Sequence, residues 1–196
     1  MAGVIRGRSP LILAFENAPQ LCCGVVHSLW YPVYLEASLG KITVVEFWQR
    51  LATKISRSYI ITGREDEVFL EGMELKENNV TDLLSYLRDN YKIGLLSNFV
   101  KEWAWMLLNR FKLENYFQKV LISSEVGKRK PCYELYLRIC DLMNVSPQKS
   151  VYITDEEEDL VVPQKIGMLP IFIPGENTCS KIGLTIHSFK ELKNIL

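Results

Sequence analysis

Acidic side chains follow the most strand-like run of the sequence. Residues 151–154 read Val-Tyr-Ile-Thr, Asp155 comes directly after them, and Asp159 follows four residues later. A short β-branched and aromatic run of this kind predicts a strand that leads into a helix. Because ligands of an open α/β sheet bind at the carboxyl ends of its strands, we expect Asp155 to lie in a ligand site. The intervening acids, Glu156–Glu158, need no ligand, since acids in the first turn of a helix are stabilised by the helix dipole.

Other polar residues end two further strand-like runs. Ser97 and Asn98 close the run over residues 91–98; they are suited to cap the next helix, and the N–H groups at the start of that helix are suited to an anion. Glu16 follows residues 11–15, Leu-Ile-Leu-Ala-Phe, a continuous apolar run of the kind that a strand buried on both faces requires. We therefore expect Glu16, Ser97 and the acids after residue 154 to meet at one edge of a parallel sheet.

These residues must be positioned by a sheet with helices packed around it. Residues from about 22 to 90 show mainly helical spacing, with an ambiguous run at 58–62, and so predict a helical insert between the first and second strands. Further predicted strands cover residues 119–123, 150–154 and 169–173. Helices are predicted to start near Val100, at Pro131 and at Ser188. Strands that alternate with helices imply a mostly parallel, doubly wound α/β sheet. The predicted domains are an α/β core, residues 1–26 and 91–196, and a helical cap, residues 27–90.

Composition restricts which class of partner and which cellular compartment we expect. Among 196 residues, Lys plus Arg and Asp plus Glu number 23 each, so no net field recruits nucleic acid or anionic membranes, and we expect small-molecule or protein partners. The five cysteines are an odd number with no CxxC pair. This argues against a disulfide framework and a thiolate zinc site, and favours a reducing, cytoplasmic location. The apolar run 11–15 is too short to span a bilayer and lacks a cleavage site, so it predicts a buried strand.

Three motifs occur in an order that resembles a known family. They are Leu95–Asn98, Gly127–Pro131 with Tyr133 and Tyr136, and Val151–Asp155 with Ile166–Met168. In order and spacing, this set closely resembles motifs two, three and four of the haloacid dehalogenase (HAD) superfamily, whose Rossmann-like core is a doubly wound parallel sheet. The helical insert resembles the C1-type cap of that superfamily, which lies between motifs one and two.

The resemblance implies a phosphate and magnesium site. Ser97, with Asn98 beside it, would hold a phosphoryl oxygen. Lys130 would supply the catalytic point charge that offsets the repulsion between a carboxylate and a phosphate. Asp155 would bind Mg²⁺, together with Asp159 in the superfamily's alternative Asp-x-x-x-Asp form. Without the resemblance, Ser97 would be interpreted as a helix cap and Lys130 as a solvated lysine.

Motif one departs from the superfamily pattern. The family's Asp nucleophile and its second Asp, two residues later, correspond to Glu16 and Ala18. The extra methylene of Glu16 moves its carboxylate by about a bond length, and a misplacement of roughly 1 Å costs on the order of a hundredfold in rate. Ala18 has no acid/base group, and losing general acid catalysis costs ~10²- to 10⁴-fold. Glu16 can still ligate Mg²⁺, because this ion needs only one or two protein carboxylates besides water and phosphate.

Two functions remain open on this reasoning. The first is a catalytically silent or severely impaired relative of magnesium-dependent phosphatases that binds a phosphorylated small molecule or a protein partner. The alternative is an active magnesium-dependent phosphohydrolase in which Glu16 replaces the usual Asp nucleophile. Cysteine-phosphatase chemistry is disfavoured: Cys132 and Arg138 match the C-x5-R spacing, but the residues between them are bulky helix formers with no glycine for a phosphate cradle.

Overall fold

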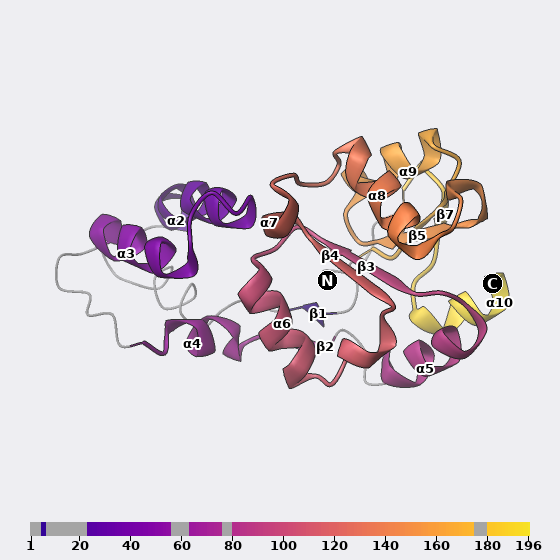
Figure 1. The fold of residues 1–196 in the computed structure, drawn as a ribbon, viewed down its shortest axis with the longest axis horizontal. Coiled ribbons are helices and arrows are strands. Elements are labelled where there is room, and N and C mark those ends of the chain that lie inside the picture. The colour runs from indigo at the N-terminus through magenta and orange to yellow at the C-terminus, as the bar shows by residue number, and fades with distance from the viewer. Residues whose placement is uncertain (1–4, 7–22, 56–62, 76–79, 175–179) are drawn as a thin grey trace.

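Parallel strands with helices between them form the centre of the molecule in the computed structural model, which describes residues 5–6, 23–55, 63–75, 80–174 and 180–196 (Figure 1). The described strands are β1 (Ile5–Arg6), β2 (Glu74–Leu75), β3 (Gly94–Ser97), β4 (Lys119–Ile122), β5 (Val151–Thr154), β6 (Leu169–Phe172) and β7 (Leu184–Thr185). Strand β3 pairs with β4, β5 with β6, and β6 with β7, all in parallel. Strands β1 and β2 pair antiparallel.

Helices lie between and around these strands. The described α-helices are α2 (Cys23–Ser38), α3 (Val44–Ile55), α4 (Glu65–Glu71), α5 (Val80–Asn90), α6 (Lys101–Arg110), α7 (Ser123–Val126), α8 (Tyr133–Met143), α9 (Val161–Lys165) and α10 (Leu192–Ile195). Short 3-10 helices are η1 (Glu114–Tyr116), η2 (Pro147–Lys149), η3 (Glu157–Leu160) and η4 (Phe189–Glu191). Helices α2 to α5 precede β3, and α2 and α3 lie at the left of Figure 1, away from β5 and β7. The predicted α/β core with a helical insert is confirmed.

Most predicted strands agree with the structure where it describes them. Strands β3 to β6 each lie inside their predicted runs. The helix predicted after residue 154 is present as η3 followed by α9. The shorter elements β7 and α7 were not predicted, because two to four residues are too few for a periodic signal. Helix α8 begins at Tyr133, two residues after the predicted start at Pro131, since Cys132 is still extended. The predicted strand 11–15 with Glu16, and the ambiguous run 58–62, lie outside the described residues and stay predictions.

Two serines that follow β4 bond the backbone at the start of α6. The N–H of Phe99 donates to Ser123 Oγ at 3.0 Å, and the N–H of Lys101 donates to Ser124 Oγ at 2.8 Å. We expected a cap from the residues that end β3, but the N-cap position of α6, Val100, has no side-chain cap. That expectation was wrong because the serines reach this helix from α7, which follows the neighbouring strand β4, and sequence spacing along β3 does not reveal this.

Helix α3 begins with a local capping box. Thr43 Oγ1 accepts the N–H of Glu46 at 3.2 Å, and Glu46 Oε2 accepts the N–H of Thr43 at 2.8 Å. These reciprocal bonds satisfy backbone donors that the helix itself leaves unpaired. They lower the pKa of the Glu46 carboxyl, chiefly through the backbone N–H of Thr43.

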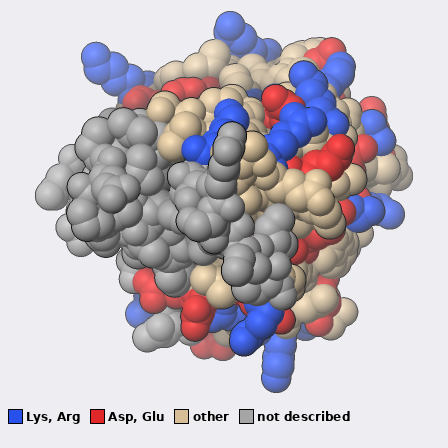
Figure 2. Space-filling view, turned by 90° about the vertical axis from the view of Figure 1, so that its left-hand side faces the viewer, with Lys and Arg blue, Asp and Glu red and all other residues tan. Residues whose placement is uncertain are grey.

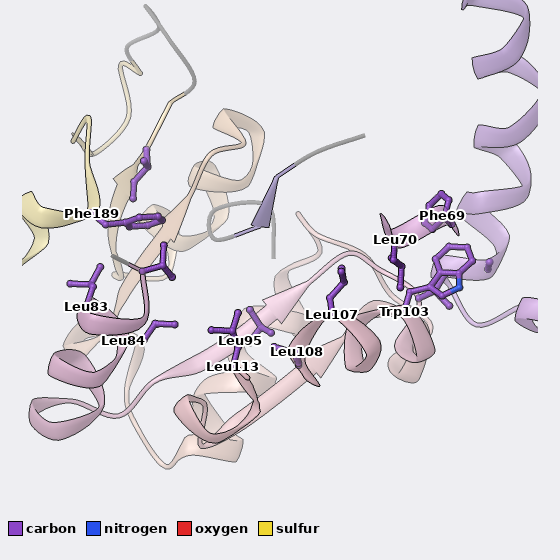
Figure 3. Packing of buried hydrophobic residues seen from close by; sticks show 14 of the residues in the cluster. Phe69, Leu70, Leu83, Leu84, Leu95, Trp103, Leu107, Leu108, Leu113 and Phe189 are labelled. Carbon is purple, nitrogen blue, oxygen red and sulfur yellow. The ribbon is translucent and has the colours of Figure 1, made fainter. Parts of the chain in front are cut away.

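One apolar cluster joins the insert to the core. It contains Phe47 and Trp48 of α3 together with Trp103 of α6 and Phe189 near the C-terminus. Figure 3 shows Phe69 and Leu70 of α4 beside Trp103, with further leucines leading toward Phe189. The ring centroids of Phe69 and Trp103 are 4.5 Å apart. Helix α5, placed in the predicted cap, also contributes leucines to this cluster, and the predicted boundary at residue 90 stays a prediction.

The surface carries charges of both signs. In Figure 2, Lys and Arg side chains alternate with Asp and Glu over the described part of the face that includes the insert. None of the helices in the described ranges is long and apolar enough to cross a membrane.

Candidate phosphate and magnesium site

Lys130 lies in the loop before α8, and its ammonium group is buried. The Nζ atom is 2.5 Å from Asp159 Oδ2, and the two side chains are only 9% and 7% exposed. The same nitrogen donates to the Tyr152 hydroxyl at 3.1 Å. An ammonium group has three donors, so these bonds engage two and leave one for an anion. The charge of Asp159 offsets the cost of burying Lys130.

Two tyrosines enclose this ion pair. The rings of Tyr136 and Tyr152 meet edge to face, with centroids 5.1 Å apart, and the Tyr136 hydroxyl donates to the backbone carbonyl of Asp159 at 3.3 Å. Burial raises the pKa of both phenols. Both therefore remain neutral at physiological pH, and they hold the ion pair through packing and hydrogen bonds.

The side chain of Asn98 positions the loop that carries Lys130. The Lys130 N–H donates to Asn98 Oδ1 at 2.7 Å, and Asn98 Nδ2 donates to the Lys130 carbonyl at 3.1 Å. Both polar atoms of the side-chain amide are thus bonded to one backbone unit. This clamp ties the end of β3 to the lysine loop, and it leaves the second N–H of Nδ2 for another acceptor.

The other predicted site residues end neighbouring parts of the core. Ser97 ends β3 and is 4% exposed, and Thr154 ends β5 and is 3% exposed. Asp155 follows Thr154 and is half-buried. It lines the same cavity as Lys130. The structure therefore brings Lys130, Asp155 and Asp159 together, and the Asn98 clamp links Ser97 to them.

The acidic turn after β5 suits a cation. Partial desolvation of the Glu156 carboxyl, with the nearby charges of Asp155 and Asp159, raises its pKa. Acids that repel one another in this way favour a bound metal ion. Asp159 is already paired with Lys130, so Asp155 is the best placed of the described acids to ligate magnesium. The described ranges hold no group of three or more His, Cys, Asp and Glu side chains that could share a metal.

A cavity of about 560 Å³ lies between β3 and β5 and reaches Lys130 and Asp155. Leucines of α5 line one side, and Ile139 and Met143 of α8 line another. Within the described part of the chain, β3 pairs only with β4 and β5 only with β6. Each strand therefore keeps one edge for a further partner. Glu16, the predicted catalytic and metal residue, lies outside the described residues.

Sequence reasoning missed a set of contacts from α2. The Tyr34 hydroxyl donates to the backbone carbonyl of Asn98 at 3.2 Å. Arg129 Nη1 donates to Ser38 Oγ, and the Arg129 guanidinium lies 5.6 Å from the centroid of the Tyr34 ring. Ser123 Oγ donates to the Ser38 carbonyl at 2.6 Å. We call Tyr34, Ser38 and Arg129 the seam, because they join the insert to the loops of the site.

These observations define a class of protein: a parallel α/β core with a helical insert before β3, and a buried lysine with acids where β5 ends. The family model for the haloacid dehalogenase-like hydrolases matches residues 44–173. The chain belongs to the haloacid dehalogenase-like hydrolase family, as its motifs predicted.

Curated relatives of the chain are phosphatases. It is 29% identical over 159 residues to a phosphorylated carbohydrates phosphatase of Thermotoga maritima, a match that covers 80% of this chain and 68% of that protein. It is 28% identical over 129 residues to a glyceraldehyde 3-phosphate phosphatase of Methanothermobacter thermautotrophicus, which covers 61% of this chain and 57% of the relative. The chain thus spans little more than half of that second protein.

Solved structures support the same fold. A HAD family enzyme from Bacteroides thetaiotaomicron superposes with a TM-score of 0.76 at 22% identity, covering 90% of this chain and 92% of that one. A structure of the same enzyme in complex with magnesium and inorganic phosphate gives a TM-score of 0.74 at 21% identity, covering 92% and 93%. At this level of identity, the likeness describes the fold alone.

Proposed function

We propose that this protein binds a phosphorylated small molecule or a protein partner, with the ligand at the ends of β3 and β5 and with little or no hydrolysis. The observation that carries the proposal is the buried ammonium of Lys130, fixed by Asp159 and Tyr152 with one N–H left for an anion. The hydroxyl of Ser97 and those N–H groups at the start of α6 that Ser123 and Ser124 do not occupy are further donors of the kind that phosphate favours. Of the two ligand types, the small molecule is favoured by the phosphatase relatives.

Magnesium fits the proposed site. Asp155 would hold it, with Glu16 as a second carboxylate if residues 11–15 form the predicted strand, and bound Mg²⁺ would neutralise phosphate charge. Lys130 contacts the anion, and Asn98 keeps the lysine loop in register with β3. The weak hydrolysis follows from Glu16 and Ala18, which stand where the family pattern has two aspartates.

An active phosphohydrolase is the second candidate, since the relatives described above are phosphatases. In this alternative Glu16 takes the place of the Asp nucleophile. The two candidates differ in one measurement, the magnesium-dependent turnover of p-nitrophenyl phosphate. We expect turnover close to the background rate. Robust turnover that disappears in Glu16→Ala would favour the active enzyme.

Binding is tested separately by thermal shift with inorganic phosphate and MgCl₂. A ligand at a hundredfold excess over Kd stabilises the folded state by about 2.7 kcal/mol, or ~5–10 °C in Tm for a chain of this size. Lys130→Ala alone would leave Asp159 buried without its counter-charge, at a cost of ~3–5 kcal/mol. The double variant Lys130→Ala/Asp159→Ala removes both charges, and we expect it to lose the phosphate response. Asp155→Asn should lose mainly the magnesium response. If neither ligand shifts Tm at millimolar concentration, the binding proposal fails.

A further inference from the structure

Arg129 is a half-buried cation at the seam between the insert and the site. Its guanidinium donates to the Ser38 hydroxyl of α2 and lies against the Tyr34 ring. Burial raises the pKa of Tyr34, whereas the charge of Arg129 acts to lower it. Both neighbours of the guanidinium are therefore neutral, a hydroxyl and a phenol.

The two cations that flank Arg129 in its loop are each paired with an acid. Lys128 pairs with Glu134 at 2.8 Å, and Lys130 pairs with Asp159 at 2.5 Å. In the described ranges, no carboxylate lies within ion-pair distance of Arg129. Withdrawing a charge from water without a counter-charge is costly. A half-buried guanidinium held in this way is prepared for an anion that the described side chains do not supply.

The position of Arg129 relates this anion to the proposed phosphate site. Arg129 directly precedes Lys130, whose backbone is clamped by Asn98. The Tyr34 ring that faces Arg129 also bonds the Asn98 carbonyl through its hydroxyl. The guanidinium and the phosphate-site lysine are thus joined through one connected set of contacts, which runs from Tyr34 through Asn98 to the backbone of Lys130.

We propose that Arg129 is a specificity-determining residue that binds a second oxyanion, a carboxylate or a second phosphate, on the phosphorylated ligand. This inference rests on the proposed function. The planar fork of a guanidinium matches both carboxylate and phosphate oxygens. The preferred ligand is then a small phosphate ester with two anionic ends, one at Lys130 and one at the seam.

The test uses three non-hydrolysable probes and isothermal titration calorimetry in the presence of Mg²⁺. Ethylphosphonate carries one anionic group, phosphonoacetate adds a carboxylate, and methylenediphosphonate adds a second phosphonate. A charge-assisted hydrogen bond is worth ~1.5–3 kcal/mol, which is about a 10- to 100-fold ratio in Kd. We expect wild-type protein to favour at least one of the two-ended probes over ethylphosphonate by about tenfold or more.

Matched variants assign that preference to Arg129. Arg129→Gln should reduce the ratio toward one while ethylphosphonate still binds. Lys128→Gln removes an equal charge from the same loop and should preserve the ratio. Arg129→Lys, which keeps the charge but loses the fork, should retain part of it and replaces Arg129→Gln if the latter does not fold.

The possible outcomes separate the two proposals. If no probe binds wild-type protein, the proposed phosphate site itself fails. If ethylphosphonate binds as tightly as both two-ended probes, or if their advantage survives in Arg129→Gln, the phosphate site stands and the role of Arg129 is overturned. Which two-ended probe is favoured distinguishes a carboxylate from a second phosphate.

Discussion

Single charged residues around the end of β5 differ in how their charges are balanced. Lys130 and Asp159 neutralise one another in a buried pair, whereas Glu156 lies beside two acids and has a raised pKa. The ion pair supports the site whether or not a ligand is bound. The acidic turn is instead held in a state that a cation or a proton would relieve. The pH dependence of stability can distinguish these two contributions.

We predict that Glu156→Gln raises Tm at pH 7 and that the gain shrinks as the pH falls toward 4. A carboxyl whose pKa is raised on folding binds its proton more readily in the folded state. Its contribution to stability is therefore full below the unfolded value of about 4.5 and is lost as the pH rises through the folded pKa. Surface substitutions are worth up to ~0.5 kcal/mol, which is about 1–2 °C here. Differential scanning calorimetry from pH 4 to 8 measures the effect, with Glu158→Gln as the charge-matched control. A gain that is independent of pH would contradict the assignment.

At the level of elements, one carboxylate joins the insert to the core. Asp66 Oδ1, on α4, accepts the indole N–H of Trp48 from α3 at 2.6 Å and that of Trp103 from α6 at 2.7 Å. Both indoles are buried, at 4% and 0% exposure. Arg110 of α6 adds a bond from its Nη1 to the carbonyl of Leu70 at the end of α4, at 2.8 Å. Three helices are therefore joined by polar bonds within the apolar cluster.

We expect Asp66→Ala to lower the free energy of unfolding by ~2–4 kcal/mol, because it leaves two buried indole donors without their acceptor. Asp66→Asn keeps a carbonyl oxygen and should cost less. Urea denaturation followed by tryptophan fluorescence measures both. Asp89→Ala is the control, since Asp89 pairs with Arg88 at the surface and such pairs contribute little. An Asp66→Ala variant as stable as Asp89→Ala would show that the shared carboxylate does not join these helices.

At the level of the whole molecule, insert and core share one apolar cluster. Side chains of α2, α3 and α4 belong to the same cluster as those of β3, α6 and the C-terminal elements. A domain boundary drawn from sequence at residues 27–90 separates segments by their position along the chain. The packing instead makes them depend on one another for burial.

We therefore predict a single cooperative unfolding transition in urea. Trp48 and Trp103 report on the joint between insert and core, and far-UV circular dichroism reports on all helices, so the two signals should change together. A fluorescence change that precedes the loss of circular dichroism would mean that the insert separates before the core unfolds.

Local chemistry determined much of this protein from sequence alone. Apolar and β-branched runs determine β3 to β6, because burial on both faces needs such residues wherever the strand lies. Motif order was enough to predict the family and to select Lys130, Asp155 and Asp159 as neighbours. The strand over residues 11–15, which rests on its apolar run, and the role of Glu16, which rests on motif order, stay predictions.

Only the tertiary structure decided which partner each polar group takes. Asn98 was predicted to contact phosphate, which stays a prediction, and its amide also bonds the backbone of Lys130, 32 residues away. The backbone N–H groups at the start of α6 donate to serine hydroxyls of α7. Arg129 donates to the hydroxyl of Ser38, 91 residues away. Hydrogen bonds act over about 3 Å and depend on direction. Their partners are therefore set by how helices and strands pack in space, which residue type and spacing along the chain do not encode.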